Sequence, residues 1–197
     1  MTRQIKQRHH IGGSSLELVI GDIASETTDA IVNAANSYLL GGGGVDGAIH
    51  AAAGPALLAE CKQVRAQHGL LAPGHAIGTA GGNLKAKYVI HTVGPVWQGG
   101  DDGEAAILES CYRKSLQIAE QLGCTSVSFP SVATGAFGYP LHAAAKIAIG
   151  AMIQNLPLLS SVVNVRFVLF DSRTHRAYSD AALKLTTVGR VTESHLC

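Results

Sequence analysis

Two polar side chains, Asn36 and Asp46, flank a run of four glycines, Gly41 to Gly44, shortly after an apolar segment. Glycine adopts positive φ at little steric cost, and its missing Cβ lets backbone N–H groups approach a ligand closely. From Val45 onward the sequence is typical of a helix start, where free N–H groups favour an anion. This stretch therefore predicts a phosphate site with Asn36 and Asp46 beside the bound group.

A second glycine-containing segment, residues 131–140, has the same context, because it follows a strand-like run and precedes a helical pattern. A lone glycine turn often does no more than connect two elements. Two such loops at strand exits fit the rule that open α/β sheets bind ligands beyond the carboxyl ends of their strands. Together the two loops favour a diphosphate ligand.

Length and composition are those of one globular domain. The chain has 197 residues, 47% of them hydrophobic and 15% charged, and its formal net charge is +1. Such a length can bury a full core, and the near-neutral charge leaves no electrostatic footprint for nucleic acid. We expect residues 15–190 to form the domain, residues 1–14 a flexible N-terminal extension and residues 191–197 a C-terminal tail.

One basic run stands at the N-terminus, where charged ends are usually solvated. Contact with RNA or an acidic partner is the alternative reading, and it would make the protein an interaction module. The run consists of Arg3, Lys6, Arg8, His9 and His10.

No apolar run reaches 18 residues, and the N-terminus has no apolar signal-peptide core, so we expect neither membrane insertion nor secretion. The cysteines are widely spaced without a C-x-x-C pair, which argues against a disulfide framework or a structural zinc site. We therefore expect reduced thiols and a cytoplasmic location. The cysteines are Cys61, Cys111, Cys124 and Cys197.

Strand and helix patterns alternate along the chain, which predicts an α/β fold with a largely parallel sheet and helices on both faces. Period-2 or short apolar runs predict the strands, and apolar residues recurring every three to four positions predict the helices. The strands are predicted over 16–20, 30–33, 75–80, 88–93, 125–130 and 163–170, and the helices over 45–53, 55–67, 104–122, 141–155 and 174–185.

Six short motifs together resemble a macro domain of the MacroD-type branch, which includes the bacterial O-acetyl-ADP-ribose deacetylases. The resemblance runs from about Leu16 to about Leu185 and implies a three-layer α/β/α macro fold with a mixed, mostly parallel central sheet. The motifs are residues 21–23, 33–36, 41–47, 48–54, 91–95 and 134–140.

The resemblance implies an ADP-ribose-binding hydrolase that cleaves an ester at the distal ribose and needs no metal or cofactor. The ester would be O-acetyl-ADP-ribose, ADP-ribose linked to an acidic side chain of a protein, or both. A non-catalytic ADP-ribose reader is the alternative. His50, His91 and His142 lack metal-ligand spacing, and we interpret them as structural.

Catalysis is assigned by the resemblance to Asp46 and Asn36. Asn36 would orient the ribose or a water, and Asp46 would support the attack of water at the distal ribose. Asp46 would either deprotonate that water or assist one held by the ligand's own phosphate. Read without the resemblance, Asn36 is a turn residue and Asp46 an ordinary first-turn acid.

The other predicted site residues bind substrate. Asp22 would accept from the adenine amino group, although it also fits an Asx turn or helix N-cap. Phe170 would pack on the adenine, although such a residue is more often core, and Phe137 would position the distal ribose or plug its loop. The remaining predictions are Ile23, Asn33, Gly43, Gly44, Val45, Ser131, Thr134, Gly135, Ala136 and Gly138.

Overall fold

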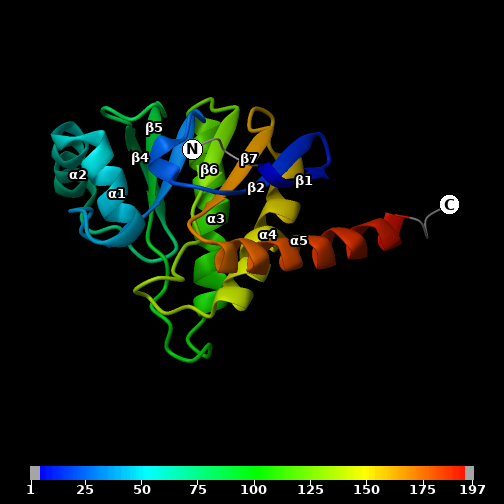
Figure 1. Ribbon diagram of the computed structural model, residues 1–197. Coiled ribbons are helices and arrows are strands. Elements are labelled where there is room, and N and C mark those ends of the chain that lie inside the picture. Colours follow the sequence, from blue (N-terminus) through cyan, green and yellow to red (C-terminus); the bar gives the residue numbers. More distant parts are fainter. Residues whose placement is uncertain (1–4, 194–197) are drawn as a thin grey trace.

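The computed structural model describes residues 5–193, and within this range the chain forms a seven-stranded mixed sheet in the order β1-β2-β7-β6-β3-β5-β4 (Figure 1). The five inner strands run parallel, and the edge strands β1 and β4 pair antiparallel to their neighbours. The strands are β1 (Ile5–Ile11), β2 (Ser14–Ile20), β3 (Ala30–Ala34), β4 (Ala76–Ala80), β5 (Tyr88–Thr92), β6 (Ser126–Phe129) and β7 (Asn164–Leu169).

Helices cover both faces of the sheet, so the predicted three-layer α/β/α fold is confirmed (Figure 1). The helices α1 (Gly44–Ala53) and α2 (Pro55–His68) lie on one face, and α3 (Glu104–Gln121), α4 (Leu141–Asn155) and α5 (Ser172–Glu193) lie on the other. Two short 3₁₀ helices, η1 (Ile23–Ser25) and η2 (Leu156–Leu158), complete the set.

Two separate hydrophobic cores fill the layers because successive strand residues point to opposite faces. On β3, Ile31 packs with Ile49 of α1 and Leu57 of α2. Its neighbour Val32 packs on the other side with Leu116 of α3. The α1–α2 core is the smaller one, and the first glycine loop stands at its edge.

Strand β1 was not predicted. The sequence indicated an extension over residues 1–14, whereas the structure places Ile5–Ile11 on the sheet edge, paired with β2. The polar run reads as a tail, but charged side chains are common on edge strands, where they discourage pairing with other chains. Arg8 donates to the buried Glu17 of β2. Part of the predicted basic run and of the predicted C-terminal tail, residues 1–4 and 194–197, lies outside the described residues.

Parallel strands bring their carboxyl ends to one edge of the sheet, and four loops meet there. Residues 21–23 follow β2, residues 35–43 follow β3, residues 130–139 follow β6, and Phe170 follows β7. Both glycine loops of the sequence therefore lie at the same edge, as their context predicted.

Glu120 of α3 holds the connection that leads into β7. Its carboxylate accepts from the Ser161 hydroxyl and from the backbone N–H groups of Ser160 and Val162. These bonds, that of the Ser161 hydroxyl first, lower the pKa of Glu120 from 4.5 to about 2. Because the pKa is depressed by folding, the stabilisation is complete above about pH 4.5 and is lost as the pH falls towards 2.

Replacing this acid with its amide should remove that pH-dependent stabilisation. Glu120→Gln is expected to lower the free energy of unfolding at pH 7, and the difference from the wild type should shrink between pH 4.5 and 2. Denaturant unfolding at several pH values measures it. Glu109→Gln on the same helix is the control, since Glu109 makes only a half-exposed i,i+4 pair with Arg113. If the free energies of unfolding of the wild type and Glu120→Gln differ as much at pH 3 as at pH 7, Glu120 does not supply the pH-dependent stabilisation.

Among the described residues, no helix is long and apolar enough to span a membrane. Cys61, Cys111 and Cys124 are buried and unpaired, and the fourth cysteine, Cys197, lies outside the described residues.

Candidate functional site

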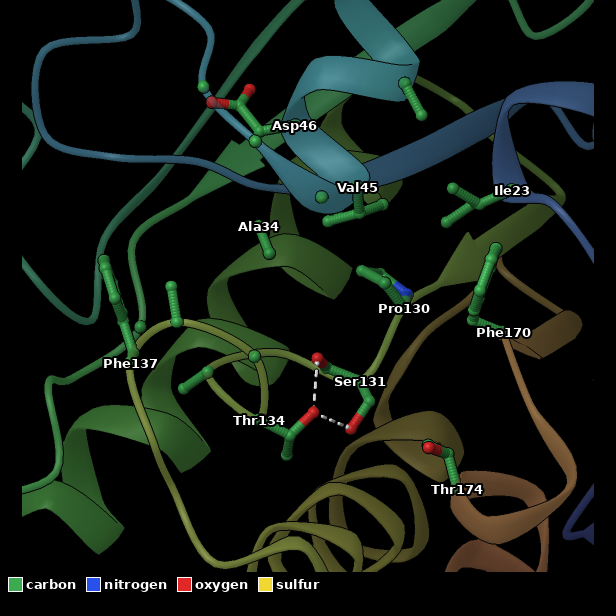
Figure 2. A pocket seen from close by; sticks show the side chains of 18 of the residues that line it. Ile23, Ala34, Val45, Asp46, Pro130, Ser131, Thr134, Phe137, Phe170 and Thr174 are labelled. Atoms are coloured by element: carbon green, nitrogen blue, oxygen red, sulfur yellow. Dashed lines mark hydrogen bonds between the residues drawn. The ribbon is translucent and has the colours of Figure 1, made fainter.

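A cavity of about 750 Å³ opens at the carboxyl ends of β2, β3, β6 and β7 (Figure 2). This volume lies in the range of small-molecule sites, roughly 300–1,000 Å³. In this view Phe137 lies on the left of the cavity, Ile23 and Phe170 lie on the right, and Asp46 lies above it. The cavity is lined by these residues and by residues of both glycine loops, among others.

The first loop delivers the N-terminus of α1 to the cavity. Gly43 is the N-cap and makes no side-chain cap hydrogen bond, and the first amide bonded within this turn is that of Gly47, which donates to the Gly43 carbonyl. The amides of the preceding helical residues therefore have no acceptor within the helix. Gly43, Gly44 and Val45 line the cavity here, and the anion site expected at this helix start stays a prediction.

The second loop is held by a chain of hydroxyls that starts in the core. Tyr112 of α3 accepts from the Val132 amide and contacts the Tyr178 hydroxyl at 3.2 Å. Tyr178 of α5 donates to Ser131 Oγ at 3.0 Å, and Thr134 Oγ1 lies 2.7 Å from the same oxygen (Figure 2). Ser131 Oγ accepts from Tyr178, and its own proton can go either to Thr134 Oγ1 or to an acceptor in the cavity.

The backbone of this loop is strained at Ala133, whose φ is +64°, in the left-handed region that few residues other than glycine adopt. Gly94, after β5, allows the loop to pack closely, since a Cβ there would lie 2.9 Å from that of Ala133. Gly138 also has a positive φ, +70°, and donates to the Gly135 carbonyl, so it closes the turn.

The carboxylate of Asp46 is 4% exposed and is held on both oxygens. Asn33 Nδ2 donates to Oδ1 at 2.7 Å, and Asn36 Nδ2 lies 3.5 Å from Oδ2. Asn36 also donates to the Gly41 carbonyl and accepts from the Tyr38 amide. Asn36 therefore shapes the turn, as the alternative reading had it, and contacts Asp46 as well.

His50 lies one turn after Asp46 on α1, with its Nε2 3.4 Å from Asp46 Oδ1. The nitrogen is buried, and the contact falls outside hydrogen-bond geometry. The i,i+4 spacing puts both side chains on one helix face. The sequence reading of His50 as a structural residue missed this contact, although the spacing of Asp46 and His50 on a predicted helix was visible.

His50, Cys61 and His91 bring three possible metal-ligand atoms within 4.8 Å of one another. His91, however, uses both ring nitrogens in contacts with Asn33 and Thr79. Burial, with the charges of Asp46 and Glu60, raises the pKa of the Cys61 thiol to about 11, so the thiolate that a metal prefers is disfavoured. Packing and hydrogen bonding account for this cluster.

At the opposite end, Asp22 caps η1 by accepting from the Ala24 amide at 3.0 Å. The predicted N-cap is therefore present, and Asp22 also lines the cavity. Phe170 is 87% exposed, which excludes the core alternative. Phe137 is half-buried and packs against the larger core, as the plug alternative had it, and it also lines the cavity, while its contact with the distal ribose stays a prediction.

Two predicted substrate-binding residues do not line the cavity. Asn33 is fully buried beneath Asp46, because its position on β3 turns the side chain into the α1–α2 layer. Gly138 serves the turn that closes the second loop. All the other predicted site residues line the cavity: Asp22, Ile23, Asn36, Gly43, Gly44, Val45, Asp46, Ser131, Thr134, Gly135, Ala136, Phe137 and Phe170.

The sequence reading also missed several lining residues, namely Gly21, Ala34, Ala35, Gly42, Ala48, Gly94, Pro130, Ala133, Val168, Asp171 and Thr174. Most of them neighbour predicted residues. Thr174 could be found only from the fold, which brings the start of α5 beside the second loop.

Sequence comparison identifies related proteins over most of the chain. The model of the Macro domain family matches residues 32–148. An O-acetyl-ADP-ribose deacetylase of Citrobacter koseri is 53% identical over 165 residues, which cover 84% of this chain and 93% of the relative. A macro domain-containing protein of Caldanaerobacter subterraneus is 50% identical over 166 residues, covering 84% and 94%.

Solved structures are similar in fold as well as in sequence. The Oceanobacillus iheyensis macrodomain with ADP is 44% identical, with a TM-score of 0.88 and coverage of 92% of this chain and 96% of the other. The Trypanosoma brucei macrodomain in complex with ADP-ribose is 40% identical, with a TM-score of 0.76 and coverage of 84% and 68%.

Proposed function

The chain belongs to the macro domain family, and on that premise we propose that it binds ADP-ribose and hydrolyses O-acetyl-ADP-ribose to ADP-ribose and acetate. The observation that carries the proposal is the buried Asp46 carboxylate in the lining of a cavity that also meets the N-terminal amides of α1 and the hydroxyl of Ser131. Relatives that bear the name O-acetyl-ADP-ribose deacetylase at about half identity support the same reaction.

In this proposal the ligand lies along the cavity. The adenine contacts Ile23 and Phe170, and Asp22 accepts from its amino group. The diphosphate lies between the first turn of α1 and the second loop, where neutral amides and hydroxyls can bind anions without cationic side chains. This mode of binding agrees with the formal net charge of +1. The distal ribose then reaches Asn36, Asp46 and Phe137.

Asp46 would act on the water that attacks the ester carbonyl. Its Oδ1 is occupied by Asn33, which leaves Oδ2, beside Asn36, as the oxygen that can accept a proton or orient the water. A water held by the ligand's phosphate and supported by Asp46 remains the second route. In both routes the attack gives a tetrahedral intermediate, whose bond to the ribose oxygen then breaks; that oxygen takes up the proton removed from the water, and acetate is released.

An ester between ADP-ribose and a protein glutamate has the same reacting bond, so we propose mono-ADP-ribosylated proteins as a further substrate class. The cytoplasmic location stays a prediction. A reader without hydrolysis is the alternative function, and it is disfavoured because a binding module needs neither the buried Asp46 nor its Asn36 contact.

Single-turnover hydrolysis tests the function. Wild-type protein should cleave O-acetyl-ADP-ribose in the presence and absence of a chelator, and Asn36→Ala should cleave it more slowly by roughly tenfold or more, since positioning residues contribute at least that much. Glutamate-linked mono-ADP-ribosylated protein, assayed in parallel, tests the second substrate. Calorimetric binding of ADP-ribose without cleavage of either ester would make the protein a reader.

A further inference from the structure

Behind the Asp46 carboxylate lies a line of buried polar side chains that the proposed reaction does not use. Asn33 and His91 are direct partners in the parallel β3–β5 ladder, and Thr79 lies on β4, the next strand. All three are at most 3% exposed. Asn33 Nδ2 lies 3.2 Å from His91 Nδ1, and Thr79 Oγ1 lies 2.9 Å from His91 Nε2.

The directions of these hydrogen bonds follow from Asp46. The Asn33 amide turns its NH₂ group towards Asp46 and donates one N–H to Oδ1. The second N–H of that group then points to His91 Nδ1, which must be unprotonated to accept it. The ring proton therefore sits on Nε2 and is donated to Thr79, whose own hydroxyl donates to the Val89 carbonyl.

His91 is suited to remain a neutral acceptor. Burial, and secondarily the charge of His50, lower its pKa to about 3. A protonated ring would carry an N–H on Nδ1 that faces the Asn33 N–H, which would then lose His91 as its acceptor. His91 does not line the cavity, so it can act on a bound substrate only through other residues.

We propose that His91 is a positioning residue, which acts as a fixed acceptor that sets the Asn33 amide and, through it, the Asp46 carboxylate. Asn33 has a single way to satisfy both its N–H groups, so Oδ1 of Asp46 is anchored at 2.7 Å and Oδ2 is presented beside Asn36. The proposal rests on the proposed function, because it assigns His91 to the turnover of that site and leaves ligand binding to other residues.

A pair of nearly isosteric variants separates positioning from packing. His91→Asn keeps an acceptor close to the place of Nδ1, whereas His91→Leu removes it, and both lose the bond to Thr79. We expect kcat for O-acetyl-ADP-ribose to fall roughly tenfold or more in His91→Leu, with KM and ADP-ribose affinity unchanged, and His91→Asn to recover most of the loss. Equal losses in the two variants, or a loss of binding, would overturn the proposal.

A second measurement is independent of activity and of variant folding. Long-range ¹H–¹⁵N spectra of the wild-type imidazoles should show His91 as the neutral Nε2–H tautomer from pH 5 to pH 8. A ring protonated on Nδ1 overturns the proposal whether or not the protein is a hydrolase. Absence of wild-type hydrolysis together with the Nε2–H tautomer would overturn the proposed function and the role of His91 in it, and leave only the anchoring of Asp46.

Discussion

Asp46→Ala is expected to reduce single-turnover hydrolysis of O-acetyl-ADP-ribose by roughly a hundredfold or more while ADP-ribose still binds. A group that accepts or directs the proton of attacking water typically contributes about 10²–10⁴ in rate. Binding should be retained because the proposal assigns the adenine and diphosphate contacts to other residues that line the cavity. The rate constant and the affinity, measured on the same preparation, give both quantities.

Removing the Asp46 carboxylate also disturbs the buried side chains around it, so the control variant must keep the size and shape of the Asp46 side chain. Asp46→Ala leaves the buried Asn33 N–H group without its acceptor, which costs about 1–3 kcal/mol of stability. Asp46→Asn retains the volume and removes the charge, and it should be similarly slow. Near-normal turnover in either variant would contradict the role given to Asp46.

Gly47→Ala should weaken ADP-ribose binding by roughly tenfold, the equivalent of about 1.4 kcal/mol. A Cβ on Gly47 would lie 2.5 Å from the carbonyl oxygen of Gly42, which is backbone and cannot rotate away. The first loop must therefore shift at the point where Gly42 and Gly43 line the cavity. Calorimetric titration with ADP-ribose measures the effect.

Gly150→Ala on α4 is the matched control, because it is the same exchange within a helix and a Cβ there meets nothing within 4 Å. Alanine is the better helix former by about 0.8–1.0 kcal/mol, so this variant should gain stability and bind ADP-ribose normally. Equal affinities in the two variants would show that the Gly42–Gly47 contact does not shape the loop.

Periodicity was sufficient for most of the fold. The long apolar stripe that includes Leu108 and Leu116 predicted α3, and the observed helix ends within one residue of that prediction. β1 was missed because an edge strand can carry a polar sequence, and its place depends on pairing with β2 and on the Arg8–Glu17 contact, a nonlocal interaction. Local patterns contain no information of that kind.

The cavity lining was largely predictable, whereas the support beneath it was not. Glycine loops and strand exits located Gly43, Gly44 and Ser131, because those features are local. Asn33 and His91 lie on different strands, and their contact depends on the register in which β3 pairs with β5. A polar residue at the end of an apolar strand run was the available signal, since buried polar groups need partners.

The two cores on opposite faces of the sheet support different loops of the site. Asp46 lies on α1, which buries its Ile49 in the smaller core beside Leu57. The second loop is hydrogen-bonded to Tyr112 and Tyr178, which belong to the larger core. Because α1 carries both Asp46 and the amides proposed for the diphosphate, substitutions in the smaller core should change turnover and binding together, whereas substitutions around Tyr112 and Tyr178 should act through the second loop.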